Sequence, residues 1–295
     1  MNLGYVGLGA MGGAIARRMM EKFTLRVFDL RPEAVSAFAD AGAVATQNSA
    51  ALGAECDIAC TCLPNSDDVE NAIFDDHGLA AGMKEGGLIV DMTTGDPLAT
   101  KAMAARLAER GIHMIDAPVS GGPRGAEAGT LAIMVGAPQA LFDRALPAFN
   151  AVSPNVFHTG EVGTGHTMKL VNNVIAAGMR AVTLEALAMG RKNGLSLATC
   201  AEVLAKGSGN SFTVEHTLPR LLEGDTEVNF QLGLMLKDVR LATKLGFESD
   251  APMPMGSLVR ESLLAAVNEF GAAGDLNREI DIVERRAGVK LAGDD

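Results

Sequence analysis

Short apolar runs alternate with amphipathic helical patterns through residues 3–160 of the chain. The apolar runs have the length of buried strands, and the segments between them repeat with a helical period. Strands that alternate with helices form βαβ units, so this order predicts a mostly parallel sheet. We expect strands at residues 3–9, 26–29, 44–46, 58–63, 88–93, 113–119, 131–136 and 155–160.

The pattern changes after Gly165. From there to about residue 290, helical patterns dominate and convincing strand patterns are absent. Residues 165–192 read as one long helix that is apolar on most sides and ends at Lys192-Asn193-Gly194. Such a helix must be enclosed, either by its own domain or by a second subunit. We therefore expect an α/β domain over residues 1–162 and an all-α domain over residues 163–295, with a mobile tail at 292–295.

Composition narrows the class of protein. The chain has 295 residues, is 48% hydrophobic and carries a formal net charge of −11, from 25 basic and 36 acidic residues. An acidic surface argues against nucleic-acid binding, which needs clustered positive charge. Membrane-span patterns are absent, and the first strand begins at Leu3, which leaves no room for a targeting peptide. We expect a soluble, cytoplasmic protein without a nucleic-acid or membrane partner.

The four cysteines do not predict a metal site. Cys60 and Cys62 would share one face of a strand, and the five histidines are scattered singly. A zinc site needs further ligands at suitable spacing. Buried, reduced cysteines are the favoured interpretation, and no metal is expected.

A glycine-rich turn follows the first expected strand. Residues 7–12, GLGAMG, match the pattern GxGxxG and open a helical pattern. Gly7 permits a tight turn, Gly9 lets a pyrophosphate approach the backbone, and Gly12 allows close packing of helix on strand. The helix N-terminus adds free N–H groups and a positive dipole end. This context favours a Rossmann-type dinucleotide-binding domain, although the pattern alone is weak evidence.

Asp29 ends the second expected strand, at the position where a carboxylate binds the ribose diol of NAD and repels a 2′-phosphate. NAD is therefore the favoured cofactor. Arg31 lies close by and can accommodate the phosphate of NADP, so NADP is the alternative. A second interpretation of Asp29 is a helix N-cap before Pro32.

Lys169 is the only formally charged side chain in residues 165–178, GHTMKLVNNVIAAG. An ammonium is costly to bury unless a partner is present or its pKa falls. From the residues alone, a catalytic lysine and a lysine that extends its ammonium to solvent at a domain edge are equally favoured.

Six motifs in order along nearly the whole chain connect these features. Together they make the sequence resemble the β-hydroxyacid dehydrogenases, the family of 3-hydroxyisobutyrate dehydrogenase and tartronate semialdehyde reductase. The motifs are GLGAMG (7–12), CLPN (62–65), DMTTGDP (91–97), DAPVSGG (116–122), GTGHTMKLVNN (163–173) and KDVRLA (237–242).

The resemblance implies hydride transfer between NAD(P) and a short 3-hydroxy acid, with Lys169 as the catalytic residue. As an amine, Lys169 can take the hydroxyl proton, and as an ammonium it can protonate the alkoxide in the reverse direction. Desolvation and the positive ring of the oxidised cofactor are expected to lower its pKa. Asn173 lies one helical turn further on and faces the same site.

The resemblance also places Leu63 and Pro64 beside the cofactor, Thr94 near the nicotinamide, and Lys237 within reach of the cofactor. It assigns the segment Ser120-Gly121-Gly122 to the substrate carboxylate. As residues alone, that segment is a plausible anion nest, but a simple loop after a strand is the favoured interpretation. The full expected cofactor-binding set is Gly7, Gly9, Ala10, Met11, Gly12, Asp29, Leu63, Pro64, Thr94 and Lys237, and the substrate-binding set is Ser120, Gly121, Gly122 and Asn173.

Related activities fit the sequence less well. 6-Phosphogluconate dehydrogenases carry a histidine where this chain has Asn172 and are much longer, and imine reductases characteristically lack the lysine. Two alternatives stay open: a non-catalytic dinucleotide-binding scaffold and a reductase of a related semialdehyde such as tartronate semialdehyde. Arg124 is either a surface residue or a contact for a second carboxylate or further hydroxyls. The apolar helix at 165–192 predicts a homodimer or homotetramer.

Overall fold

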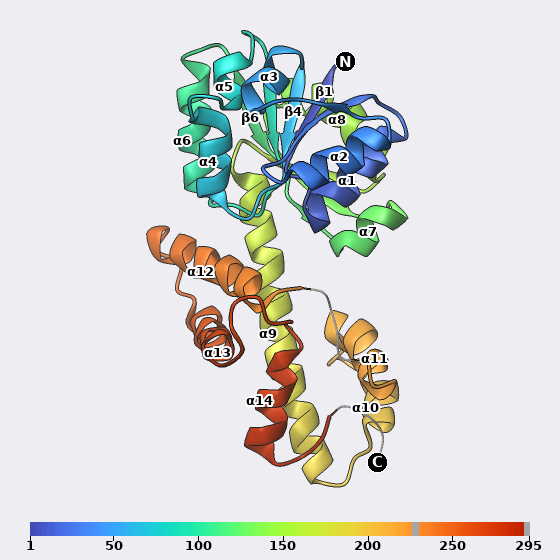
Figure 1. Ribbon diagram of the computed structural model, residues 1–295. Coiled ribbons are helices and arrows are strands. Elements are labelled where there is room, and N and C mark those ends of the chain that lie inside the picture. The colour runs from blue at the N-terminus through green and yellow to red at the C-terminus, as the bar shows by residue number, and fades with distance from the viewer. Residues whose placement is uncertain (226–229, 292–295) are drawn as a thin grey trace. The chain divides into compact units, whose positions relative to one another are not determined.

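The computed structural model describes residues 1–225 and 230–291 (Figure 1). The chain divides into two compact units, Met1–Lys169 and Leu170–Asp295, here called the N-terminal and C-terminal units. The division at 162/163 stays a prediction, and the expectation for the tail at 292–295 lies outside the described residues.

The N-terminal unit is built on a nine-stranded sheet in the order β3-β2-β1-β4-β5-β6-β8-β7, with β9 paired to β8 (Figure 1). The pairs from β3 to β6 are parallel, whereas β8 is antiparallel to both β6 and β7. The parallel part has the strand order of a Rossmann fold, which confirms the expected fold class. The strands are β1 (Leu3–Val6), β2 (Leu25–Phe28), β3 (Val44–Ala45), β4 (Ile58–Thr61), β5 (Leu88–Asp91), β6 (His113–Asp116), β7 (Val119–Ser120), β8 (Ala132–Gly136) and β9 (Val156–Gly160).

One expected strand was wrong in its extent. The segment 113–119 was expected to form a single strand, but it breaks after Asp116 into β6 and β7. Pro118 has no N–H to donate to a ladder, and its carbonyl accepts a hydrogen bond from the Met134 amide (3.0 Å). The chain turns there, so that β7 runs antiparallel to β8.

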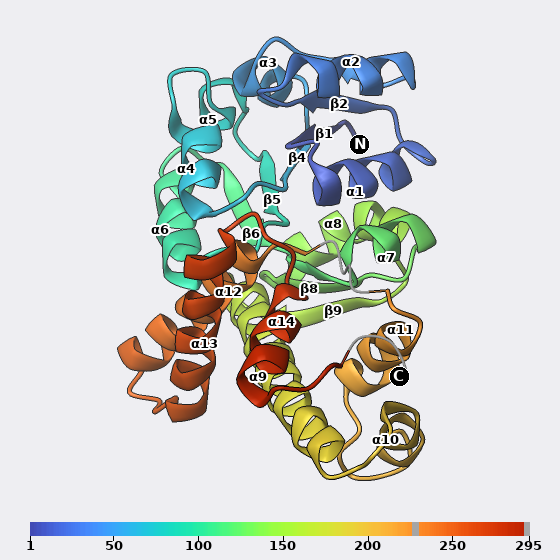
Figure 2. The same ribbon diagram turned by 60° about the horizontal axis from the view of Figure 1, so that its bottom comes forward.

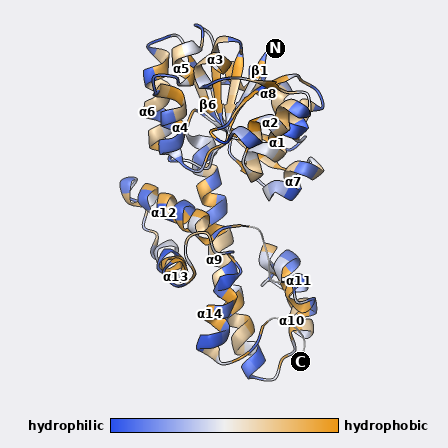
Figure 3. Ribbon diagram, in the orientation of Figure 1, coloured by the Kyte–Doolittle hydropathy of each residue, from blue (hydrophilic) through white to orange (hydrophobic). Residues whose placement is uncertain are grey.

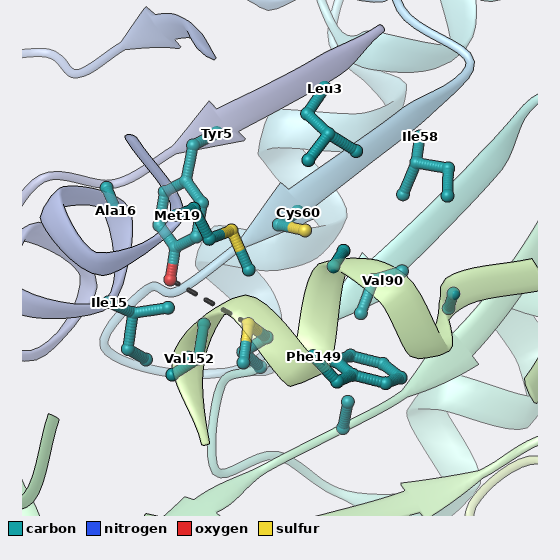
Figure 4. Packing of buried hydrophobic residues seen from close by; sticks show 14 of the residues in the cluster. Leu3, Tyr5, Ile15, Ala16, Met19, Ile58, Cys60, Val90, Phe149 and Val152 are labelled. Carbon is teal, nitrogen blue, oxygen red and sulfur yellow. Dashed lines mark hydrogen bonds between the residues drawn. The ribbon is translucent and has the colours of Figure 1, made fainter. Parts of the chain in front are cut away.

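Helices cover both faces of the sheet because successive strand residues point to opposite sides. Leu3 and Tyr5 of β1 pack in one apolar cluster with α1 and α8, while Val6 packs in the other with α3 to α6. Figures 2 and 4 show the helices and the first cluster. The helices are α1 (Ala10–Met20), α2 (Pro32–Asp40), α3 (Ser49–Ala54), α4 (Ser66–Phe74), α5 (Leu79–Gly82), α6 (Pro97–Ala108), α7 (Gly122–Ala128) and α8 (Gln139–Val152).

The described residues of the C-terminal unit form helices joined by turns and loops, with one isolated bridge between Gln231 and Asp275. The expected change from α/β to all-α structure is therefore confirmed. Its longest helix, α9 (Thr164–Lys192), begins in the N-terminal unit and supplies apolar side chains to two clusters. The other elements are α10 (Leu197–Leu204), a π-helical turn η1 (Thr213–Thr217), α11 (Leu218–Leu222), α12 (Leu232–Glu248), α13 (Pro254–Phe270) and α14 (Arg278–Ala287).

One buried ion pair joins α9 to α14. Arg180 Nε donates to Glu279 Oε2 at 2.9 Å, and Arg180 Nη2 donates to Asn277 Oδ1. Burial raises the pKa of Glu279 above its usual value, although the charge and hydrogen bond of Arg180 oppose that shift. Arg180 is thus the group that allows an ionised carboxylate at this position.

Removing Arg180 should leave a buried, unpaired carboxylate. We expect Arg180→Ala to lower the free energy of unfolding by about 3–5 kcal/mol at neutral pH. The pKa of Glu279 in the folded variant then lies further above its unfolded value. The folded state binds more protons, so the deficit should shrink as pH falls from 7 toward 5.

Urea unfolding of the unaltered protein and of Arg180→Ala between pH 7 and pH 5 measures this difference in the free energy of unfolding. The control is Arg260→Ala, because Arg260 pairs with its neighbour Glu261 at the surface and should contribute about 0–1 kcal/mol. Equal, small effects of the two substitutions would contradict the importance of the buried pair.

Candidate active site

The glycine-rich turn leaves β1 and enters α1. Gly7 has a positive φ of 96°, and a Cβ there would lie 2.4 Å from the Cys62 carbonyl oxygen. A Cβ on Gly12 would lie 2.1 Å from the Gly7 carbonyl oxygen, whereas nothing lies within 4 Å of a Cβ on Gly9. Gly7 and Gly12 are therefore required by close backbone packing. Gly9 leaves open space at the start of α1, where a phosphate could approach free N–H groups.

Asp29 follows β2 and faces this turn. Its Oδ2 accepts a hydrogen bond from the Leu8 amide at 2.6 Å, and the Arg31 amide and guanidinium donate to the same carboxylate. Burial alone would raise the pKa of Asp29, but the hydrogen bonds from Arg31 and Leu8 lower it on balance. Asp29 is not the N-cap of α2, because that position is Arg31. The carboxylate is thus held ionised beside the turn.

The carboxyl ends of the central strands lie in register. Val6, Thr61, Asp91 and Asp116 are successive partners across β1, β4, β5 and β6. The loops after these residues therefore leave one edge of the sheet, which is where open α/β sheets bind ligands.

Two of those loops are tied together. The Leu63 amide donates to Thr93 Oγ1 at 3.0 Å, so the loop with Leu63 and Pro64 is fixed to the loop with Thr93 and Thr94. Leu63 also approaches the glycine turn, since its Cδ2 would lie 2.8 Å from a Cβ on Gly7. The glycine turn, the Leu63 loop and the Thr93 loop are thus in contact with one another at the carboxyl edge of the sheet.

The segment Ser120-Gly121-Gly122 spans the junction of β7 and α7, with only Gly121 between the two elements. Gly121 and Gly122 both have positive φ, 130° and 67°. A Cβ on Gly121 would lie 2.9 Å from Leu131 Cδ2, whereas the space beside Gly122 is open. Arg124 is exposed on α7.

Lys169 is buried on the second turn of α9, with 8% of its surface exposed. The start of this helix is fixed to the sheet by Asp116, whose two carboxylate oxygens accept hydrogen bonds from the amides of Gly163 (2.6 Å) and His166 (2.7 Å). Burial raises the pKa of Asp116, although the His166 ring and these two hydrogen bonds oppose the shift.

A second group forms in the C-terminal unit around Asp238, which is buried. Asn173 Nδ2 donates to Asp238 Oδ2 at 2.5 Å, and Lys237 Nζ lies 3.0 Å from Asp238 Oδ1. The expected substrate residue Asn173 and cofactor residue Lys237 are thus joined through one carboxylate.

Sequence reasoning missed the roles of Asp238, Asp116 and His166. For Asp238 a signal existed, because the apolar helical positions 232, 235, 239 and 242 place residue 238 on the same buried face. A carboxylate on such a face requires a partner. Asp116 bonds the amides of Gly163 and His166, which lie 47 and 50 residues further along the sequence. Contacts over such separations leave no periodic signal in the sequence.

Burial raises the pKa of the Cys60 thiol to about 12, so this group is a protonated thiol at neutral pH. No group of three metal-ligating side chains occurs in the described part of the chain.

Among the described residues, no helix has the length and apolar character of a transmembrane span.

The sheet order, the glycine turn and the carboxylate after β2 define a Rossmann-type dinucleotide-binding protein. Two family models match the chain: the NAD-binding domain of 6-phosphogluconate dehydrogenase over residues 2–160, and the NAD-binding region of NADP-dependent 3-hydroxyisobutyrate dehydrogenase over residues 163–282. The chain belongs to the β-hydroxyacid dehydrogenase family. It is an oxidoreductase of the class that uses a nicotinamide dinucleotide.

Individual relatives align over most of their length. A 2-(hydroxymethyl)glutarate dehydrogenase of Eubacterium barkeri is 37% identical over 300 residues, which cover 99% of this chain and 98% of the relative. An NAD-dependent L-serine dehydrogenase of Pseudomonas aeruginosa is 36% identical over 264 residues, 87% of this chain and 89% of the relative. The solved structure of the Mycobacterium tuberculosis 3-hydroxyisobutyrate dehydrogenase with L-serine is 28% identical, with a TM-score of 0.89, covering 96% of this chain and 98% of that one.

Proposed function

We propose that the protein transfers a hydride between NAD and a short 3-hydroxy acid, with Lys169 as the general acid and base. The observation that carries the proposal is the place of Lys169, a buried lysine near the start of a helix fixed to the carboxyl edge of the sheet. Hydroxyl oxidation needs a proton acceptor near that edge. A lysine does this well, because burial readily brings its pKa into a useful range.

In the oxidative direction, Lys169 Nζ takes the hydroxyl proton while the C–H bond breaks and the C=O bond forms. A bound nicotinamide ring supplies the hydride acceptor. In the reverse direction, the Lys169 ammonium returns the proton to the carbonyl oxygen. Asn173 orients the substrate from the same face of α9, and Thr94 positions the reacting carbon. The hydroxyl of Ser120 and the amides of Gly121 and Gly122 hold the carboxylate.

We assign three main contacts to the cofactor. They are the backbone at Gly9, where the space is open, the carboxylate of Asp29, and the loop of Leu63, which is hydrogen-bonded to Thr93. Leu63 and its neighbour Pro64 cover one side of the cofactor, and Lys237 is assigned a cofactor contact on the resemblance of its KDVRLA motif alone. The remaining assigned contacts are Gly7, Ala10, Met11, Gly12 and Thr94.

The proposed substrate class follows from what the substrates of the three relatives described above share. 2-(Hydroxymethyl)glutarate, L-serine and 3-hydroxyisobutyrate each carry a hydroxymethyl group on the carbon next to a carboxylate, and they differ in the third substituent. We propose a substrate of this form, HOCH₂–CHX–COO⁻. Arg124 is a candidate contact when X is anionic. In the reverse direction the same site would reduce a semialdehyde such as tartronate semialdehyde.

A panel of 3-hydroxyisobutyrate, glycerate, threonate, serine and 3-hydroxypropionate tests this class with NAD and NADP, read at the absorbance of the reduced cofactor. Turnover is expected for at least one of the four compounds that have this form. Threonate lies outside the form, because its hydroxymethyl group is not on the carbon next to the carboxylate. NAD binding without turnover of any compound would favour a non-catalytic scaffold instead.

Replacing Lys169 should slow the chemical step. Because general acid–base catalysis contributes about 10²–10⁴-fold, we expect Lys169→Ala to lower kcat by about that factor while cofactor affinity stays near normal. Lys169→Arg should also be slow, since a guanidinium does not release its proton near neutral pH. Steady-state kinetics with EDTA present and cofactor titration measure both effects. Near-normal turnover in either variant would contradict the role of Lys169 as the general acid and base.

NAD is proposed over NADP because the Asp29 carboxylate lies against the glycine turn and is already hydrogen-bonded to Arg31. A 2′-phosphate would meet that negative charge. We expect kcat/KM to be higher with NAD, and Asp29→Ala to narrow the preference by freeing Arg31 for the phosphate. Arg26→Ala is the control, because Arg26 lies on β2, the strand that precedes Asp29, and pairs with Glu55 instead. Equal use of both cofactors by the unaltered protein would contradict the assignment.

A homodimer or homotetramer is proposed from an exposed apolar stripe on α9. Five apolar residues of α9 are 42–61% exposed and recur every three or four residues, apart from one position filled by exposed Ala186: Val171, Ile175, Met179, Val182 and Met189. Figure 3 shows apolar and polar segments alternating along α9. Such a stripe is the pattern of a helix face that packs against a partner. A second copy presents the same stripe and can pair with it symmetrically.

A charge within the stripe should break this contact. We expect the unaltered protein to sediment as a dimer or tetramer at micromolar concentration, and Val182→Asp to sediment as a smaller species. Val44→Asp, on an exposed valine of the N-terminal unit, should leave the assembly unchanged. A monomeric parent protein would contradict the proposal.

A further inference from the structure

We propose that His166 is a positioning residue that fixes Lys169 relative to the loop of Thr93 and Thr94. This inference rests on the proposed role of Lys169. His166 has none of its surface exposed, and it lies one turn before Lys169 on α9. It is a titratable side chain at the candidate site that the proposed proton transfer does not use.

Both ring nitrogens of His166 contact other elements of the N-terminal unit. Nε2 lies 2.9 Å from the Thr93 carbonyl oxygen, in the loop after β5, and Nδ1 lies 3.0 Å from Thr100 Oγ1 on α6. A carbonyl oxygen only accepts hydrogen bonds, so Nε2 must carry the hydrogen of that pair. The ring therefore joins α9 to β5 and α6 at once.

A carboxylate stands beside the same nitrogen. Asp91 Oδ2 lies 3.7 Å from His166 Nε2 and has no hydrogen-bond partner among the described residues. Its other oxygen, Oδ1, accepts from Thr61 Oγ1 and from the Thr93 amide, both at 3.0 Å. Thr93 is thus held at its amide by Asp91 and at its carbonyl by His166. The nitrogen that donates to the Thr93 carbonyl thus also faces this Asp91 oxygen.

The backbone of His166 is fixed as firmly as its ring. Its amide donates to Asp116 Oδ2, and the first turn of α9 packs so closely that a Cβ on Gly165 would lie 2.4 Å from the Met134 carbonyl oxygen. Gly95, two residues after Thr93, also packs closely, since a Cβ there would lie 3.1 Å from His166 Cε1. Ring and backbone together leave the helix start little freedom to rotate or shift.

These contacts form one path from the cofactor loops to the proposed base. Leu63 bonds Thr93 through its amide, Thr93 bonds the His166 ring through its carbonyl, and His166 is followed after one turn by Lys169. Without the ring, α9 keeps the Asp116 contacts but loses its direct tie to the Thr93 loop. A displacement of about 1 Å in reacting groups can cost about 10²-fold in rate.

The test compares His166→Leu, which keeps apolar volume but removes both ring nitrogens, with His166→Gln, whose amide N–H can still donate to the Thr93 carbonyl. We expect His166→Leu to lower kcat by about 10- to 100-fold, with KM for the cofactor near its normal value. His166→Gln should recover most of that loss. The rates are normalised to cofactor-binding sites, so that a smaller folded fraction does not count as slow catalysis.

A kinetic isotope effect separates positioning from general destabilisation. With substrate deuterated at the carbinol carbon, misalignment should raise the isotope effect on kcat in His166→Leu, because hydride transfer becomes slower relative to product release. A merely structural loss would leave it unchanged. The control is His158→Leu. His158 lies on β9, and its Nε2 also contacts a backbone carbonyl oxygen, that of Ala137, at 2.6 Å. The substitution therefore removes a similar contact from an element to which no role in the site is assigned. It should keep normal kcat and isotope effect.

A normal kcat in His166→Leu would overturn the inference, as would a His166→Gln variant as slow as the leucine variant. If the leucine variant does not fold, His166→Asn, which is too short to reach Thr93, replaces it with the same expected loss. Normal turnover of Lys169→Ala would instead sink the proposed function. A slow Lys169→Ala together with a normal His166→Leu would remove only the role of His166.

Discussion

Asp116 binds the first turn of α9 with both oxygens of its carboxylate. Helix starts leave amides unpaired and carry the positive end of the helix dipole, so a carboxylate there is stabilising. The carboxylate is fully buried, and burial raises its pKa. The two short amide contacts and the helix end offset that cost. Because Asp116 ends β6, a single side chain ties the start of α9 to the carboxyl edge of the sheet.

The rest of the candidate site follows from this contact. The last residues of β1, β4, β5 and β6 are aligned in register, so their loops leave from one edge. Lys169 enters the same region because it lies on the second turn of a helix that begins there. Glycine is required wherever these backbones meet, as at Gly136, where a Cβ would lie 2.6 Å from Asp116 Oδ1. The chemistry assigned to Lys169 therefore depends on packing that reaches back into the sheet.

The sequence predicted most of the fold because period and spacing are local signals. Each expected strand has a counterpart, and the strand–turn–helix context of residues 7–12 located the glycine turn. The break at Pro118 was missed because the apolar run continues through it. His166 was missed for a different reason, since the partner of its ring in the Thr93 loop lies 73 residues away. For Asp238, the helical period already indicated a buried carboxylate, but its partner Asn173 lies 65 residues away and is revealed only by the folded chain.

The most direct measurement is a crystal structure of the protein with oxidised cofactor and an unreactive analogue of the 3-hydroxy acid. The account predicts Lys169 Nζ within about 3 Å of the oxygen that stands for the reacting hydroxyl, with the His166 ring still on the Thr93 carbonyl. A Lys169 side chain directed away from that oxygen, with another group in hydrogen-bond contact with it, would contradict the account.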